Sequence, residues 1–204
     1  MDVREALLRA AIKVFAETGT RGATTRRIAQ EAHVNEVTLF RHFKSKDDLL
    51  KAALQLFATQ ASSRSLPAEP VHPRVELLEW CRAHHRELHK VRALIRRSMA
   101  EFAEHPDNCT HGMQASVRVA NDLADYLRRL KQRGLASGTW DERAASAMLM
   151  GALFADAMGR DTMPERYPYS MRDAIEHYVD LLLSAIGVSA QAPPTVRGLS
   201  GKAS

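Results

Sequence analysis

The sequence is poor in cysteine and has no long apolar run, and each shortage excludes a class of protein. Its 204 residues contain two cysteines, Cys81 and Cys109, too few for the disulfide framework of a small secreted domain. The longest apolar stretch, AMLMGALFADAM, is too short and too mixed in polarity to span a bilayer. Met1 is followed at once by charged residues, so the layout of a signal peptide is missing. We therefore expect a cytoplasmic protein with no membrane partner.

The common catalytic motifs are also missing. The chain has no glycine-rich phosphate loop, no nucleophile elbow, no paired acidic motif and no zinc-protease helix, so we expect neither enzyme activity nor a cofactor. We find no strand-like alternation of apolar and polar residues and no internal repeat. Apolar residues instead recur at intervals of three and four. The sequence therefore predicts an all-α protein.

Positive charge is concentrated toward the N-terminus, although the net charge of +5 is modest. Residues 1–55 hold ten Lys and Arg against seven Asp and Glu, as expected for a segment that meets a polyanion. Within it, the stretch from Thr24 to Lys46 predicts two short helices joined by a tight turn, with Asn35 capping the second. Their apolar residues can be buried against a helix that begins near Val3 and ends at Gly19. The face left outward is rich in hydroxyl and cationic side chains.

The string TTRRIAQEAHVNEVTLFRHFKSKDDLL, preceded by LLRAAIKVFAETGTRGA, resembles the DNA-binding domain of the tetracycline-repressor (TetR/AcrR) family of bacterial regulators. The resemblance covers roughly residues 5–56. His33 stands where the family mostly has a turn glycine, so its backbone is expected to be strained. Phe40 stands where tyrosine is commonest, which removes a hydroxyl that could reach DNA. The resemblance implies a helix-turn-helix domain, a larger helical domain, and a homodimer that binds a palindromic operator in double-stranded DNA.

The resemblance also assigns roles on the outward face of the two short helices. Thr38, His42 and Lys46 match positions that hold the DNA backbone. Glu36, Val37 and Phe40 match positions pressed into the major groove, where a carboxylate can accept from cytosine N4 and an apolar side chain can pack on a thymine methyl. The residues predicted to bind DNA are Thr24, Thr25, Arg26, Arg27, Glu36, Val37, Thr38, Phe40, His42 and Lys46.

Composition divides the chain into four parts. We expect a DNA-binding domain over residues 1–46 and a connecting helix over 47–60, which begins with a capping box at Ser45. The resemblance implies an effector-binding and dimerisation domain over residues 61–187, whose first helical stretch is expected to break between His89 and Arg92. The tail, residues 188–204, is rich in Ala, Pro, Gly and Ser and is expected to be disordered.

The two final helices, 141–160 and 170–187, have surfaces suited to a partner subunit. Small residues recur every four positions on the first, which permits close helix packing, and the second has a broad apolar face after a capping box at Ser170. A single subunit is not expected to cover both surfaces. The predicted dimer interface consists of Ala147, Gly151, Ala155, Tyr178, Leu182 and Ile186.

A small, largely apolar effector is expected to bind in the C-terminal domain and to release a repressor from its operator. Methionine adapts to varied ligands, and tryptophan and histidine offer polar groups, although some of these residues can equally be ordinary core. The candidate effector-binding residues are Trp80, His84, Met99, Phe102, Met113, Val117 and Phe154.

A metal- or redox-responsive regulator on the same fold is the alternative. Cys81, His85 and His89 are spaced by four residues and so share a helical face, which suits Zn²⁺ or a softer ion. A helical scaffold that binds only protein is a weaker alternative. Our main prediction has no metal site, and the sequence leaves the effector, the operator and the regulated genes open.

Overall fold

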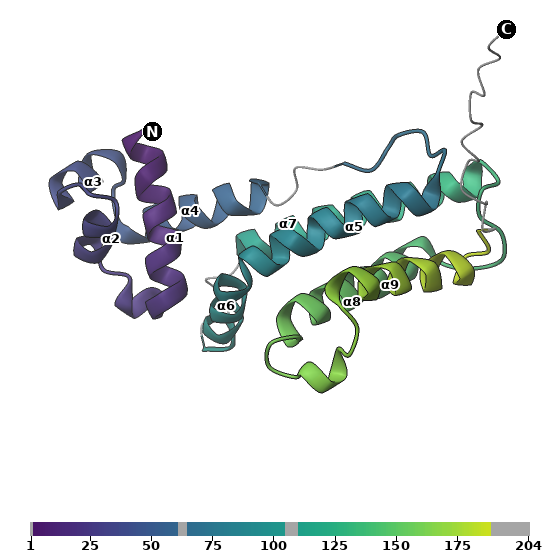
Figure 1. Cartoon of the computed structure of the whole chain (residues 1–204). Helices are drawn as coiled ribbons and strands as arrows, with labels where there is room; N and C mark the ends of the chain where they lie inside the picture. Colours follow the sequence, from purple (N-terminus) through teal and green to yellow (C-terminus); the bar gives the residue numbers. More distant parts are fainter. Residues whose placement is uncertain (1, 61–64, 105–109, 189–204) are drawn as a thin grey trace, which may run out of the picture.

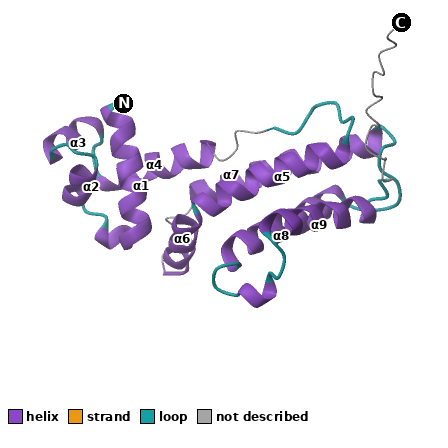
Figure 2. Cartoon of the chain, viewed as in Figure 1, coloured by secondary structure: helices purple, strands orange, loops and turns teal. Residues whose placement is uncertain are grey.

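The computed structural model describes residues 2–60, 65–104 and 110–188, with the backbone alone for residues 55, 57–60, 101–104 and 110–115. Every regular element in this part of the chain is helical (Figures 1 and 2), which confirms the all-α fold class. Val188, the first residue of the predicted disordered tail, packs against the C-terminal core, and the rest of the tail lies outside the described residues. The helices are α1 (Val3–Gly22), α2 (Thr25–Glu31), α3 (Glu36–His42), α4 (Lys46–Gln60), α5 (Pro73–Lys90), α6 (Arg92–Glu104), α7 (Thr110–Gln132), α8 (Glu142–Gly159), the 3-10 helix η2 (Pro164–Arg166) and α9 (Met171–Ala185).

Short-range signals in the sequence set the helix boundaries. The side chains of Asn35, Ser45 and Ser170 each accept a hydrogen bond from the amide three residues on, at 2.7, 3.1 and 3.2 Å, so all three predicted caps are confirmed. His33 has a φ of 55°, the left-handed conformation expected from its place in the turn. Gly19 has a φ of 69° and interrupts α1, which resumes for less than one turn before Ala23.

Helices α1 to α4 form a small N-terminal domain at one end of the molecule (Figure 1). Its core is built from the stripe of α1, the inner faces of α2 and α3, and the first turns of α4. The buried residues include Leu7, Ala11, Phe15, Ile28, Leu39, Phe43, Leu49 and Ala53. This core holds α2 and α3 together, so their opposite faces are free to meet a ligand.

The larger C-terminal domain is a bundle in which α8 packs against α5, α7 and α9. Its core draws on long apolar stripes of these four helices, with Leu77, Leu123, Leu127, Leu153 and Val179 among the fully buried residues. No helix in the described ranges is long and apolar enough to cross a membrane.

Helix α6 joins the two domains, which the sequence did not reveal. The predicted break is confirmed, because α5 ends at Lys90 and α6 begins at Arg92. Leu94 is buried in the core of the N-terminal domain and Val91 packs beside it. On another side of α6, Arg96 forms an ion pair with Asp161, just after α8. The helix therefore contacts both the DNA-binding end and the C-terminal bundle.

Candidate nucleic-acid interface

Helices α2 and α3 are fixed relative to each other by buried apolar side chains and by one polar contact. Ile28 and Leu39 are fully buried in the shared core. At the surface, the hydroxyl of Thr25 donates a hydrogen bond of 2.8 Å to a carboxylate oxygen of Glu36. Thr24 caps α2 by accepting from the amide of Arg27 at 3.3 Å. The outer face is thus carried on a rigid pair of helices.

Exposed cations surround this outer face. Among the residues that the structure describes, Arg26, Arg27, Arg41 and Lys44 are exposed and form no ion pair with a carboxylate. Uncompensated positive charge on one face attracts a polyanion and favours contact with phosphates. Arg41 lies one turn beyond Val37 on α3, yet the sequence-based set gave it and Lys44 no role.

The outward side of α3 also presents two apolar side chains. Val37 is 63% exposed and Phe40 is 52% exposed, whereas Leu39 between them is fully buried. Positions three apart on a helix lie side by side, so these two side chains form one small apolar surface. An α-helix fits the major groove of B-form DNA, so such a face can meet base edges directly.

Two of the residues that were predicted to hold the DNA backbone already have hydrogen-bond partners inside the protein. The ammonium of Lys46 donates to the carbonyl of Thr20 at 2.8 Å, and the hydroxyl of Thr38 donates to Oδ1 of Asn35 at 2.8 Å. A lysine has three N–H donors, so Lys46 can keep this bond and still reach a phosphate. His42 is exposed at the end of α3. The predicted DNA-binding residues therefore share α2, α3 and the start of α4.

The predicted effector-binding residues are scattered over the C-terminal domain. Trp80 is buried and its indole stacks on the ring of His84, with centroids 5.2 Å apart. Phe154 is half-buried, whereas Met99 and Val117 are exposed. The side chains of Phe102 and Met113 lie outside the described residues. Burial and the neighbouring His85 lower the pKa of His84 to about 4, so this imidazole is neutral at pH 7, and its buried Nε2 has no hydrogen-bond partner in the described chain.

The metal site suggested by spacing does not form. Within the described ranges, no group of three or more His, Cys, Asp or Glu side chains is arranged to hold a metal ion. Cys81 is fully buried, and burial raises its pKa to about 12, so it is a thiol and not a metal-binding thiolate. His85 shares the helical face with Cys81 but bonds to Asp156 instead. In the described chain, Cys81, His85 and His89 therefore do not form the three-ligand metal site that this alternative uses.

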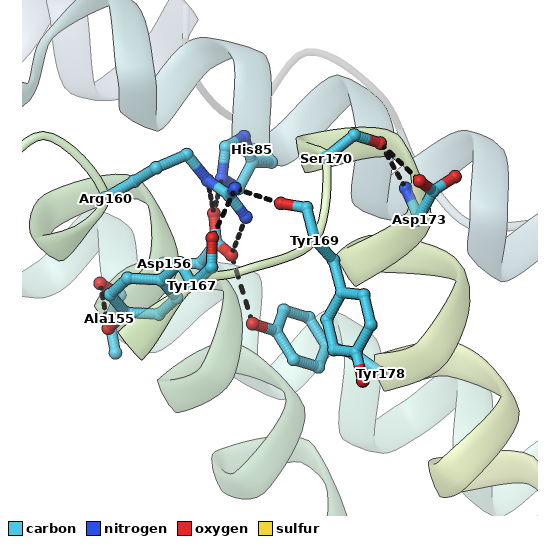
Figure 3. A network of polar contacts seen from close by, with 9 residues as sticks. All are labelled: His85, Ala155, Asp156, Arg160, Tyr167, Tyr169, Ser170, Asp173 and Tyr178. Atoms are coloured by element: carbon cyan, nitrogen blue, oxygen red, sulfur yellow. Dashed lines mark hydrogen bonds and ion pairs between the residues drawn. The ribbon is translucent and has the colours of Figure 1, made fainter. Parts of the chain in front are cut away.

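Asp156 is the centre of a buried polar network that joins three helices (Figure 3). Its carboxylate accepts from Nε2 of His85 on α5 at 2.8 Å, from Nη2 of Arg160 at 2.5 Å and from the hydroxyl of Tyr178 on α9 at 3.0 Å. Burial alone would raise the pKa of Asp156, but these bonds outweigh it and lower the pKa to about 2. Arg160 also donates to the carbonyl of Tyr169 in the loop before α9.

The small-residue stripe of α8 faces outward. Ala147 and Gly151 are exposed and Ala155 is half-buried, with Met148, which is 71% exposed, beside them. A β-carbon added at Gly151 would meet no other atom within 4 Å, so this surface is open.

The structure corrects two of the predicted interface residues, one on α9 and one directly after it. Leu182 and Ile186 are buried in the core of their own chain, whereas Leu181 is 69% exposed. Tyr178 is half-buried and lines a surface hollow of about 550 Å³ between α9 and the loop before it. Leu181, His177 and Ser184 line the same hollow, so it opens on the outward side of α9.

Comparisons with known proteins agree with this geometry. The sequence model of the family described as "Bacterial regulatory proteins, tetR family" matches residues 7–53. The uncharacterized HTH-type transcriptional regulator YvkB of Bacillus subtilis (strain 168) is 27% identical over 187 residues, which cover 88% of this chain and 95% of YvkB. The tetracycline repressor protein class C of Escherichia coli is 36% identical over 66 residues, 32% of this chain and 30% of that repressor.

A solved structure extends the similarity to both domains. The fatty acid degradation regulator FadR from Bacillus halodurans has a TM-score of 0.66 to this chain at 22% identity, over 88% of this chain and 94% of FadR. At that identity the match shows a shared fold. With the family match over α1 to α4 and a relative aligned over nearly its whole length, the chain belongs to the tetR family of bacterial regulatory proteins and is a DNA-binding transcriptional regulator.

Proposed function

We propose that this regulator is a repressor that binds a palindromic operator as a homodimer and is released by a small, largely apolar effector. The observation that carries the proposal is the outward cationic face of α2 and α3, connected through α6 to a separate helical bundle. The repressor role draws on the similarity of the N-terminal part to the tetracycline repressor.

The two parts of the DNA-binding face do different work in this proposal. Arg26, Thr38, His42 and Lys46 hold the phosphate backbone, which gives affinity that falls as salt rises. Thr24, Thr25 and Arg27 support this contact from α2. The outward side of α3 enters the major groove and distinguishes the bases.

The dimer forms through the outward faces of α8 and α9. The exposed stripe with Ala147, Gly151 and Ala155 allows the equivalent helix of a second copy to approach closely. Met148 and Leu181 are large apolar side chains left open on the same two helices, and a second copy covers them together with the hollow beside Tyr178. Leu182 and Ile186 support this face from within the core.

The effector binds inside the C-terminal domain, near the stacked rings of Trp80 and His84. Two buried nitrogens there, Nε2 of His84 and Nδ1 of His85, have no hydrogen-bond partner in the described chain. A mostly apolar ligand with one polar group would satisfy such an atom, which is a strong reason to bind. Met99, Phe102, Met113, Val117 and Phe154 are the remaining candidates for its surroundings.

Effector binding reaches the DNA-binding face through α6. Arg92 and Arg96 tie this helix to Asp161 after α8, and Arg97 donates to the carbonyl of Thr18 near the end of α1, at 3.4 Å. Lys46 donates to Thr20 in the same segment of α1. A coupling free energy of roughly 1–3 kcal/mol along this path would change DNA affinity about 5- to 150-fold.

Selection of bound sequences from random duplex DNA by the full-length chain tests the proposal. We expect an inverted repeat to be enriched, with Lys46→Ala weakening binding to all sequences about equally. Lys90→Ala is a matched control, since this lysine lies at the end of α5 and pairs with Glu87, outside the DNA-binding domain. Failure to enrich any sequence at low salt would overturn specific operator binding. The enriched duplex is then used to screen small apolar ligands. If none of them changes the affinity of the protein for this duplex, the proposed release by an effector is wrong.

A further inference from the structure

The surface hollow beside Tyr178 has the size and the lining of a small-molecule site. It lies between α9 and the loop that precedes α9, and its volume of about 550 Å³ falls within the range of roughly 300–1,000 Å³ that is usual for ligand sites. Aromatic and apolar side chains contribute much of its wall: Tyr167, Tyr169, His177, Tyr178 and Leu181. A wall of this kind with a few polar groups suits an organic ligand.

Two of the tyrosine rings are held in place by hydrogen bonds of their hydroxyl groups. Tyr167 donates to a backbone carbonyl of α8 at 2.8 Å, and Tyr178 donates to the carboxylate of Asp156 at 3.0 Å (Figure 3). Tyr169 is 58% exposed, and its ring meets the ring of His177 edge-on, with centroids 4.8 Å apart. Rings that are already fixed can stack on an aromatic ligand at little cost in side-chain freedom.

The charges around the hollow favour a negatively charged ligand. Asp180 contributes a carboxylate to the lining, but Arg74 pairs with it through bonds of 2.7 and 3.0 Å. Arg160 is likewise paired with Asp156. Arg166 is exposed and forms no ion pair with a carboxylate in the part of the chain that the structure describes, and its guanidinium lies 5.9 Å from the centroid of a tyrosine ring. This guanidinium can bind a carboxylate through two parallel N–H donors.

An aromatic ring that bears a carboxylate matches both properties of the hollow. We infer that the hollow binds a small aromatic carboxylate, with its ring against Tyr167 and Tyr169 and its carboxylate on Arg166. The hollow lies on the outward side of α9, whereas the proposed effector site lies beside Trp80 and His84 on α5. The inference therefore adds a second ligand site to the proposed function and does not depend on the first.

A second copy of the chain is the competing occupant, because the same side of α9 belongs to the proposed dimer interface. Met148 and Leu181 are the large apolar side chains open on that interface, and neither supplies an anion for Arg166. We expect the second copy to cover the rim of the hollow and the ligand to neutralise Arg166 inside it.

Isothermal titration calorimetry of the full-length chain at low salt tests the inference with three probes. Naphthoate has both the ring and the charge, naphthamide keeps the ring without the charge, and acetate keeps the charge without the ring. We expect naphthoate to bind and naphthamide to bind about ten-fold more weakly, the factor that corresponds to losing one hydrogen bond between charged groups. Acetate should give no measurable binding, because it makes no contact with the tyrosine rings.

Variants of the exposed side chains locate the ligand. Arg166→Gln should weaken the binding of naphthoate about ten-fold, to the level of naphthamide, and leave the binding of naphthamide unchanged. Tyr169→Ala should weaken the binding of both, since it removes part of the aromatic wall. Arg86→Gln is the matched control, because Arg86 is an exposed arginine on α5 outside the hollow, and it should change neither affinity.

Several outcomes would overturn the inference. Naphthoate that binds equally well to Arg166→Gln must lie elsewhere on the protein, and equal affinities for naphthoate and naphthamide would show that the charge is not recognised. Failure of the wild-type chain to bind naphthoate also overturns it. Binding that then appears in Gly151→Arg, changed at an open position of α8, would show that a second copy fills the hollow. The titrations contain no DNA, so none of these failures bears on operator binding.

Discussion

Replacing Asp156 by asparagine should destabilise the C-terminal domain more than any other single change of charge in the described chain. The carboxylate is fully buried and accepts from His85 on α5, from Arg160 directly after α8 and from Tyr178 on α9 (Figure 3). Asparagine has nearly the same shape, but its NH₂ group donates and cannot accept. Asp156→Asn therefore leaves the Arg160 guanidinium without its counter-ion and turns one accepted hydrogen bond into a clash of donors.

The size of the effect follows from the pKa of Asp156. A fall from 3.8 to about 2 means that the surroundings favour the ionised form by on the order of 2 kcal/mol. Removing one member of a buried ion pair typically costs about 3–5 kcal/mol. We expect Asp156→Asn to lower the free energy of unfolding by roughly 3 kcal/mol at pH 7, measured by urea denaturation followed by circular dichroism.

The stability that Asp156 contributes should decrease as the solution becomes acidic. The folded-state pKa of Asp156 lies below its unfolded value, so its contribution is complete above about pH 4 and is lost as the pH falls toward 2. The difference between wild type and Asp156→Asn should therefore shrink below pH 4. Asp180→Asn is the control, because its pair with Arg74 is exposed and should contribute at most about 1 kcal/mol. Equal effects of the two substitutions at pH 7 would refute the importance of the buried network.

Three further predictions test other parts of the structure. Burial lowers the pKa of His84 to about 4, so the unfolded wild-type chain binds a proton at this residue before the folded chain does, and wild type should lose up to about 3 kcal/mol of stability as the pH falls from 6.5 to 4. His84→Phe should keep the stack on Trp80 and abolish this loss, which urea denaturation at pH 7 and at pH 5 checks. Gly151→Arg should leave the fold intact, because a β-carbon there meets nothing, and yield a monomer by light scattering at micromolar concentration; a dimer of unchanged affinity would contradict the proposed interface. Gly19→Ala should lower the free energy of unfolding by about 1 kcal/mol in urea, because φ is 69°, a left-handed conformation that alanine rarely adopts; an unchanged free energy of unfolding would contradict this strain.

Local structure was predictable because it depends on residues a few positions apart. A cap such as Asn35 or Ser170 bonds to an amide three residues on, and the sequence contains both partners. The left-handed turn at His33 was expected from the family resemblance, because a glycine is usual at this position. The family resemblance added the identity of the outer face, because its motif fixes which side of α3 is turned away from the core.

Long-range packing was not predictable from periodicity. Leu181, Leu182 and Leu183 are consecutive, and a helical pattern alone does not tell which of them faces the bundle and which faces outward. Leu94 lies on an ordinary amphipathic stripe, yet it is buried in the core of the other domain. The bond between His85 and Asp156 joins residues 71 positions apart, and four-residue spacing from Cys81 suggested a metal ion instead.

Hydroxyl-radical footprinting of the full-length chain on its enriched duplex tests most directly the claim that a dimer reads DNA with α2 and α3. Two copies of α3 entering successive major grooves should protect two half-sites whose centres lie one helical turn apart, about 10–10.5 base pairs, on one side of the duplex. In the double variant Arg26→Ala and Lys46→Ala, this footprint should vanish as the salt concentration is raised. A single protected half-site, or protection that does not depend on these residues of the outer face, would contradict the claim.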